Sequence, residues 1–188
     1  MTDNDFSLPS DTSPCPGFAY CVFCESGRDD IAAENVLKGL HAFAISPKVE
    51  KEECHSGVWE KCLRRMLPGY VFVYSDVPVP VSELVRVSGI LRVLKYNDGD
   101  YRLKGADRLF AEWVHAHGGM IGMSLAVKDG TKIRVADGPL KDYEGSIVEV
   151  KRQKRIAKVA IRLGDVTRYV WMGFEWLRSV DKEDNADE

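Results

Sequence analysis

The chain has 188 residues, 45% of them hydrophobic and 29% charged, so it is long enough for one large packed domain or two small ones. No apolar run approaches the ~18 residues of a membrane-spanning helix, and the polar, acidic residues 1–17 do not resemble a signal peptide. We expect a disordered leader there. The five cysteines suggest no disulfide framework, which favours reduced thiols and a cytoplasmic protein.

The net charge of −3 is unevenly distributed along the chain. Residues 128–180 carry 12 Lys and Arg against 7 Asp and Glu, whereas residues 1–127 carry 13 against 17 and residues 181–188 carry 1 against 5. A basic module beside an acidic one indicates a polyanionic partner, although an excess of this size also occurs on surfaces without that role.

The first half of the chain alternates between strand and helix patterns. Aromatic and apolar runs predict four strands, at 18–24, 41–47, 66–76 and 90–96. Helices are predicted at 25–40, 80–89 and 105–119. The charged residues 48–65 form either a hairpin or a mobile loop. This order predicts an α+β fold in which 18–117 form an α/β sandwich: an antiparallel four-stranded sheet with helices packed on it.

Two of the predicted helices have an apolar stripe that we expect to face the sheet. The first stripe consists of Ala33, Val36, Leu37 and Leu40, and the second of Ala106, Leu109, Phe110, Trp113, Val114 and His117.

The second half of the chain is β-rich. Gly118 and Gly119 begin a predicted linker, 118–127, and five short β segments follow at 131–135, 145–150, 156–163, 166–172 and 175–180. They predict a small SH3-like β-barrel over 128–180, followed by an acidic tail at 181–188.

The stretch DGPLKDYEGSIVEV, residues 137–150, predicts a corner of this barrel. Gly138 precedes a proline in a tight turn, and Gly145 is expected to have a positive φ where the next strand begins. Alternation then places Val148 and Val150 on one face of that strand.

Alternation also predicts where the barrel's cations point. If Ala157, Val159, Ile161 and Leu163 face inward, Lys158 and Arg162 face outward; if Ile133 and Val135 face inward, Lys132 and Arg134 face outward. The basic loop between two strands adds Lys151, Arg152, Lys154 and Arg155. These eight cations suit a phosphate backbone, or they are ordinary surface charges, because clustering in sequence need not be clustering in space.

The turn at Gly164-Asp165 poses a register problem. A two-residue turn there would place Arg168 on the same face as Ile161, which is predicted to be internal. We therefore expect a bulge or a longer turn.

Several segments resemble known motifs. The stretch KIRVADGPLKDYEGSIVEVKRQKRIAKVAI (132–161) resembles a KOW motif, which ribosomal proteins and elongation factors share. YCVFCESGRDDIAAENVL (20–37), RRMLPGYVFV (64–73) and SGILRVLKY (88–96) resemble the NusG N-terminal domain, in the same order. The chain is thus similar to the NusG family from about Phe18 to Val180. Within the family, IGMS (121–124) and VKRQKRIAKVAI (150–161) resemble the specialised LoaP paralogues.

The resemblance implies a transcription elongation regulator that is not an enzyme, needs no cofactor and acts as a monomer. NusG-family N-terminal domains bind the clamp helices of RNA polymerase. Carried over, this contact falls on an exposed patch at a sheet edge, which suits a helix-in-groove contact. The patch would be formed by Leu67, Pro68, Gly69 and Tyr70, with Val93 nearby. The family usually has Phe where this chain has Leu67, so we expect weaker polymerase affinity. Alternatively, Tyr70, Phe72 and Tyr74 simply pack the sheet.

The resemblance also implies nucleic-acid contacts. Arg64 and Arg65 would meet non-template DNA, unless they belong to a solvated charged loop. A LoaP-like protein would contact a nascent RNA hairpin through the eight barrel cations and promote processive antitermination. General NusG tends to carry an exposed Phe where this chain has Leu163, and uses it to recruit the ribosome or Rho.

Three alternatives to this hypothesis stay open. The chain could be a housekeeping NusG that couples polymerase to the ribosome or Rho through protein contacts alone. It could be a ribosome-associated KOW protein that binds RNA and ignores polymerase. A KOW domain that switches to a helical fold is also known in this family, but the density of Val and Ile in 131–171 favours stable β structure.

Other constellations predict no chemistry. Cys21 and Cys24 are three apart on a strand and point to opposite faces. Cys54, His55 and Cys62 could approach one another, but a zinc site needs a fourth ligand that is not evident. No metal site is expected.

Overall fold

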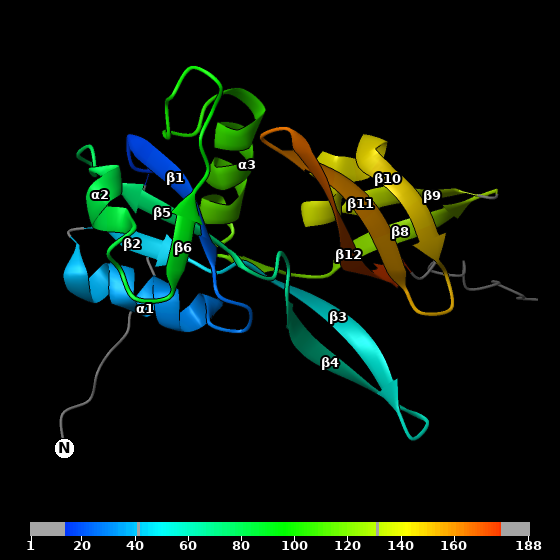
Figure 1. Cartoon of the computed structure of the whole chain (residues 1–188). Coiled ribbons are helices and arrows are strands. Elements are labelled where there is room, and N and C mark those ends of the chain that lie inside the picture. Colours follow the sequence, from blue (N-terminus) through cyan, green and yellow to red (C-terminus); the bar gives the residue numbers. More distant parts are fainter. Residues whose placement is uncertain (1–13, 41, 131, 178–188) are drawn as a thin grey trace, which may run out of the picture.

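The computed structural model describes residues 14–40, 42–130 and 132–177. Most of the predicted leader and the whole acidic tail lie outside these residues. The described chain forms a helix-covered sheet, a long hairpin and a second, rolled sheet (Figure 1). None of the helices in this part of the chain is long and apolar enough to cross a membrane.

The N-terminal sheet has four strands, all antiparallel, as the sequence predicts. In spatial order they are β2 (Phe43–Ile45), β5 (Tyr70–Ser75), β1 (Phe18–Cys24) and β6 (Ile90–Val93). Strand β5 therefore lies inside the sheet, although the patch from Leu67 to Tyr70 at its start was expected at a sheet edge. All six of its residues are buried.

Helices cover both faces of this sheet (Figure 1). Helices α1 (Asp29–Gly39) and α2 (Val81–Leu84) pack on one face through the α1-side core, which includes Val22 and Val71. Helix α3 (Gly105–Ala116) packs on the other face through the α3-side core, which includes Phe72 and Tyr74. These two aromatic rings are fully buried, as the core-packing alternative predicts.

Both predicted helix stripes are rotated relative to the observed ones. Leu37 and Leu109 are exposed, at 45% and 65%. The buried residues are instead Asp29, Ala32 and Val36 in α1, and Asp107, Phe110, Ala111 and Val114 in α3. Each helix thus turns a carboxylate of its first turn toward the protein, which a hydrophobic periodicity cannot detect.

The charged segment after β2 is a hairpin, the first of its two predicted alternatives. It consists of β3 (Lys48–His55) and β4 (Val58–Arg65), paired over their full lengths. Strand β7 (Met120–Ile121) pairs in parallel with the start of β3. The predicted linker 118–127 therefore contains strand structure.

The second sheet, hereafter the barrel, is rolled and has five strands (Figure 1). They are β10 (Ile147–Lys151), β11 (Ile156–Leu163), β12 (Val166–Trp176), β8 (Ser124–Asp129) and β9 (Lys132–Asp137), in spatial order. Its first strand begins at Ser124, inside the predicted linker. The segments predicted at 166–172 and 175–180 are not separated by a break, because β12 continues from Val166 to Trp176; residues 178–180 lie outside the described part of the chain.

The barrel interior largely follows the predicted alternation. Ala157, Val159, Ile161 and Leu163 of β11 are buried, and so are Ile133 and Val135 of β9. Strand β10 departs from the prediction. A register shift between Ile147 and Glu149 leaves Val148 exposed, while Ile147 and Val150 pack against the core.

The conformationally constrained glycine of the barrel corner is Gly138, and the expectation for Gly145 is wrong. Gly138 has φ 94° and ψ 177°, a combination that only glycine adopts readily. A Cβ there would lie 2.8 Å from the Ser124 Cα. Gly145 belongs to the 3-10 helix η1 (Pro139–Ser146), is not among the glycines with positive φ, and has open space around its Cα.

We predict that Gly138→Ala lowers the free energy of unfolding by about 2 kcal/mol, since the new methyl group is both strained and too close to β8. Urea denaturation followed by tryptophan fluorescence measures this. The control is Gly145→Ala, which should change stability by less than about 0.5 kcal/mol. Equal effects of the two substitutions would contradict the assignment.

Candidate functional site

A cleft of about 180 Å³ lies between the N-terminal sheet and the β11–β12 turn of the barrel. Figure 1 shows this turn reaching toward α3. One side of the cleft is formed by Phe23, Tyr70, Arg92, Leu94, Lys95, Tyr96 and Asn97, and the other by Leu163, Gly164, Asp165, Val166 and Arg168. The cleft therefore exists only where the two halves of the chain meet.

The floor of the cleft is aromatic and carries one stacked guanidinium. The strand register places Phe23 of β1 opposite both Tyr70 of β5 and Arg92 of β6. The Phe23 and Tyr70 ring centroids are 4.7 Å apart, and the Arg92 guanidinium lies 3.8 Å from the Phe23 ring centroid. The arrangement is that of a cation–π contact, so this floor can accept both apolar and anionic groups.

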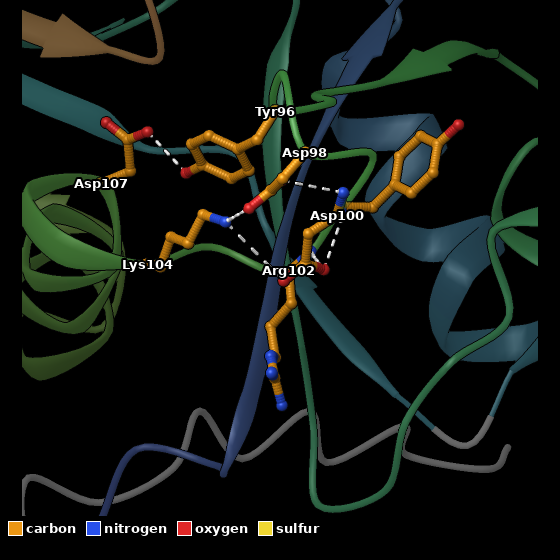
Figure 2. Close-up of polar contacts among 7 residues, drawn as sticks. Tyr96, Asp98, Asp100, Arg102, Lys104 and Asp107 are labelled. Atoms are coloured by element: carbon orange, nitrogen blue, oxygen red, sulfur yellow. Dashed lines mark hydrogen bonds and ion pairs between the residues drawn. The ribbon is translucent and has the colours of Figure 1, made fainter.

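One wall of the cleft is a loop that its own carboxylates hold in shape (Figure 2). Asp100 accepts hydrogen bonds from the backbone N–H groups of Tyr101 and Arg102, at 2.7 and 3.0 Å. Asp98 accepts one from the Asp100 N–H at 3.1 Å and forms an ion pair with Lys104. This turn presents Tyr96 to the cleft.

Asp107 joins this wall to the barrel. Its carboxylate accepts a hydrogen bond from the Tyr96 hydroxyl at 2.6 Å (Figure 2) and another from the Gly164 N–H at 2.9 Å. Burial, with the bond to Asp107, raises the pKa of Tyr96 well above its usual range, so the hydroxyl remains a donor. Asp107 is itself buried in the first turn of α3, where the helix dipole favours a negative charge.

The barrel contributes Arg168, which sequence reasoning missed. Leu163 pairs with Val166 and Ile161 with Arg168, so the turn has two residues, and the expected bulge or longer turn is wrong. The N-terminal sheet closes this end of the barrel, and Arg168 reaches across to it. Its Nε donates to the Tyr70 hydroxyl oxygen at 2.6 Å, and its guanidinium lies 5.3 Å from the Tyr70 ring centroid. The register conflict was thus the signal of an interdomain contact.

The five residues predicted to bind polymerase are not brought together. Only Tyr70 lines the cleft. Leu67 is buried in the α3-side core and Val93 in the α1-side core, on the other face of the sheet. Pro68 is exposed, and the Gly69 N–H donates to the buried carboxylate of Asp29. Because Leu67 and Tyr70 are buried, the expectation of an exposed Leu-Pro-Gly-Tyr patch is wrong for this arrangement.

Both arginines predicted to contact DNA are held by carboxylates. Arg64 donates two hydrogen bonds to Glu53, at 3.0 and 2.5 Å, and these lower the pKa of Glu53 to about 2. Arg65 Nε lies 3.0 Å from the buried Asp29 Oδ2. Arg64 keeps half of its side chain exposed, whereas Arg65 ties the hairpin to the start of α1.

The hairpin packs directly on the barrel. At Gly173 of β12 an added Cβ would lie 2.6 Å from the Glu50 carbonyl oxygen of β3, so only glycine permits this approach. Ion pairs flank the contact: Arg155 with Glu52 at 2.6 Å, and Lys61 with Glu175 at 2.8 Å.

The eight predicted RNA-binding cations are distributed over the barrel, not over one face. Arg152 donates to the Gly130 and Lys132 carbonyls, so it joins the β10–β11 turn to the β8–β9 turn. Lys132, Arg134 and Lys154 are exposed. Lys151 and Lys158 lie over aromatic rings of β12.

The other two cations point elsewhere. Arg155 faces Glu52 of the hairpin, and Arg162 lies near the β11–β12 turn, where it donates to the Gly164 carbonyl and lies 3.9 Å from Asp165.

The cysteines form neither a redox pair nor a metal site. Cys21 belongs to the α3-side core and Cys24 to the α1-side core, on opposite faces as predicted. Burial raises the pKa of Cys24 to about 12 and that of Cys21 further. In the part of the chain that the structure describes, no three His, Cys, Asp or Glu side chains are placed to hold a metal ion.

The described residues form a helix-covered antiparallel sheet and a rolled sheet of five strands, with an aromatic cleft between them. No protein-family model matches the sequence. Two curated proteins are similar, both named transcription termination/antitermination protein NusG. The one from Borreliella burgdorferi is 21% identical over 159 residues, covering 78% of this chain and 85% of the relative. The one from Thermus thermophilus is 23% identical over 164 residues, covering 77% and 88%.

A solved structure shares the fold. It was determined for a study of domain interaction in Thermotoga maritima NusG, and it aligns with a TM-score of 0.50 and 18% identity over 83% of this chain and 93% of that one. Together with the motifs of the N-terminal half, these comparisons make the chain similar to transcription termination/antitermination proteins of the NusG family in sequence and in fold.

We predict that Asp107→Ala releases the barrel turn from the cleft, because it leaves the Gly164 N–H and the Tyr96 hydroxyl without their acceptor. Amide exchange of Gly164, followed by NMR on the full chain, should become at least tenfold faster. Asp98→Ala is the matched control, since Asp98 shapes the same wall without touching the barrel. A Gly164 exchange rate unchanged by Asp107→Ala would contradict this role.

Proposed function

We propose that the chain is a transcription elongation regulator that binds RNA polymerase through its N-terminal domain and nascent RNA through its barrel. It would promote processive antitermination, act in the cytoplasm and need neither a catalytic group nor a cofactor. The names of the similar proteins support the transcriptional role. The division of labour is supported by the aromatic floor of the cleft, which the N-terminal half forms, and by the basic residues of the barrel.

The observation that carries the polymerase contact is the floor of the cleft. Phe23, Tyr70 and Leu94 present apolar surface on the α3 side of the sheet, next to the Arg92 guanidinium. An amphipathic helix with an acidic flank fits such a surface, because its apolar face covers the rings and its carboxylate meets the arginine. We therefore assign the clamp helices to this floor, with Tyr70 as its centre and Pro68 at its exposed rim.

The barrel turn shields this floor in the present arrangement. Tyr70 is only 8% exposed, and Arg168 and Gly164 bind to Tyr70 and Asp107. A polymerase helix can reach Tyr70 only if the turn moves aside. The contacts that the turn makes are few and partly polar, so a helix that covers the aromatic rings can replace them.

The proposed RNA contact is assigned to the barrel cations. Lys132, Lys154 and Arg134 are exposed near one end of the barrel, next to Arg152. Backbone phosphates suit such a group, whereas Arg155 and Arg162 would first have to leave Glu52 and Asp165. Arg64 and Arg65 would likewise have to leave their carboxylate partners, Glu53 and Asp29, before they could bind phosphates of non-template DNA.

Recruitment of the ribosome or Rho by the barrel is the second candidate function. It relies on an exposed apolar side chain at the position of Leu163, which is 3% exposed and lines the closed cleft, so it too would require the barrel turn to move aside. The RNA-directed hypothesis needs no such side chain.

We predict that Tyr70→Ser abolishes antitermination in a purified transcription assay, because it removes the ring at the centre of the polymerase surface. Arg168→Ala should instead raise polymerase affinity several-fold, since it removes a contact that shields Tyr70. The measurements are terminator read-through and binding to core polymerase.

Tyr101→Ser is the control for this test, because Tyr101 packs against the α1-side core on the other face of the sheet. Normal read-through by folded Tyr70→Ser protein would refute the assignment of the clamp helices to this floor.

We further predict that the double charge reversal Lys132→Glu and Lys154→Glu weakens RNA binding about tenfold and lowers the slope of log K against log salt by about 0.7–0.9 per lost phosphate contact. Fluorescence anisotropy with a leader RNA measures both. Lys38→Glu on the exposed side of α1 is the matched control. An unchanged salt slope in the double variant would remove phosphate contacts from this end of the barrel.

A further inference from the structure

The outer face of β12 carries two aromatic rings that the cation pattern of the sequence does not reveal. Val170 and Met172 are buried in the barrel, so the alternating Tyr169 and Trp171 point outward. Tyr169 is 58% exposed, and Trp171 is partly exposed. Two aromatic side chains that lie two residues apart on one strand and both point outward are unusual on a surface that binds no partner molecule.

Lysines from two strands surround these rings. The Lys151 ammonium of β10 lies 4.4 Å from the Trp171 ring centroid. The Lys158 ammonium of β11 lies 5.1 Å from the Tyr169 centroid and 5.6 Å from that of Trp171. The register explains the gathering, because Lys158 pairs with Trp171 across the two strands. These four residues are hereafter the aromatic platform.

We propose that the aromatic platform binds unpaired nucleotides of RNA, with Tyr169 and Trp171 stacking on bases and Lys151 and Lys158 binding phosphates. Side chains two apart on a strand are separated by about 6.7 Å, roughly twice the rise of about 3.4 Å per stacked nucleotide. The two rings therefore match bases along a single strand. This inference rests on the proposed RNA contact and names the part of the RNA that the barrel recognises.

The neighbouring residues leave room for a flat ligand. Tyr169 pairs with Ala160 of β11, whose methyl group leaves the ring uncovered on that side. The hairpin contacts β12 at Gly173 and Glu175, whereas Tyr169 is 58% exposed. A base that stacks on a ring displaces an ammonium from the ring face, and the displaced lysine is then free to meet the adjacent phosphate.

Glu149 is the acidic residue on this face. Its carboxylate lies 3.8 Å from the Lys151 ammonium and 3.6 Å from that of Lys158. It holds both lysines in the free protein and repels a phosphate. Removing its charge should therefore strengthen RNA binding, which is the opposite of what a surface for a basic protein partner would show.

The test uses the full chain and two fluorescent probes at low salt: a single-stranded RNA of about eight nucleotides and a blunt duplex of the same sequence. Tyr169→Leu should weaken binding of the single strand about tenfold. Tyr169→Phe, which keeps the aromatic ring, should bind the single strand as tightly as the wild type does. Duplex binding should change less than twofold. Glu149→Gln should strengthen single-strand binding. Trp171 fluorescence should fall on binding, and this quenching should disappear in Trp171→Leu.

The outcomes separate this inference from the function on which it rests. If the wild type binds RNA and the Lys132 and Lys154 variants weaken it, but Tyr169→Leu and Tyr169→Phe are alike, stacking is overturned and the phosphate contact stands. Stacking is also overturned if Tyr169→Leu weakens binding of the duplex and of the single strand equally. If the wild type binds neither probe, both the platform and the RNA contact of the proposed function are wrong. Because Tyr169 is exposed, its substitution does not threaten folding.

Discussion

The carboxylate of Asp107 is one of the contacts that join the two halves of the chain, together with the packing of the hairpin on the barrel. It is buried and accepts hydrogen bonds from Tyr96 of the cleft wall and from the backbone of Gly164 in the barrel turn. A buried charge without such donors would be costly, so loop, helix and turn are held in one arrangement. The position of Arg168 over Tyr70, and with it the closed cleft, follows from this placement of the turn.

A consequence of this joint is that the two candidate binding surfaces lie on different sides of the barrel. Arg168 faces the N-terminal sheet, whereas the adjacent Tyr169 points outward with Trp171. Nucleic acid can therefore reach the aromatic platform while the cleft is still closed. Under the proposed function, polymerase and RNA need not compete, and RNA at the platform would contact β12, the strand that begins at the turn over Tyr70.

Alternation in the sequence was sufficient to predict the barrel interior on β9 and β11 and the four antiparallel strands of the N-terminal sheet. Alternation and helical periodicity failed where tertiary contacts determine which side chains are buried. The helix stripes are rotated because Asp29 and Asp107 are buried, Val93 faces the other core from Tyr70, and Gly138 carries the constraint expected of Gly145. The sequence analysis did not predict the aromatic platform, because it considered only the outward-facing cations of the barrel. Tyr169 and Trp171 have the same alternating strand pattern as those cations.

Under the proposed function, polymerase binds the floor of the cleft after displacing the barrel turn. Hydrogen–deuterium exchange of the full chain, alone and with core RNA polymerase, tests it most directly. We expect slower exchange in residues 67–72 and 90–97, where the partner covers the floor, together with faster exchange in residues 163–168, where the turn is released. Unchanged exchange in 67–72, or protection of 163–168 by the polymerase, would contradict it.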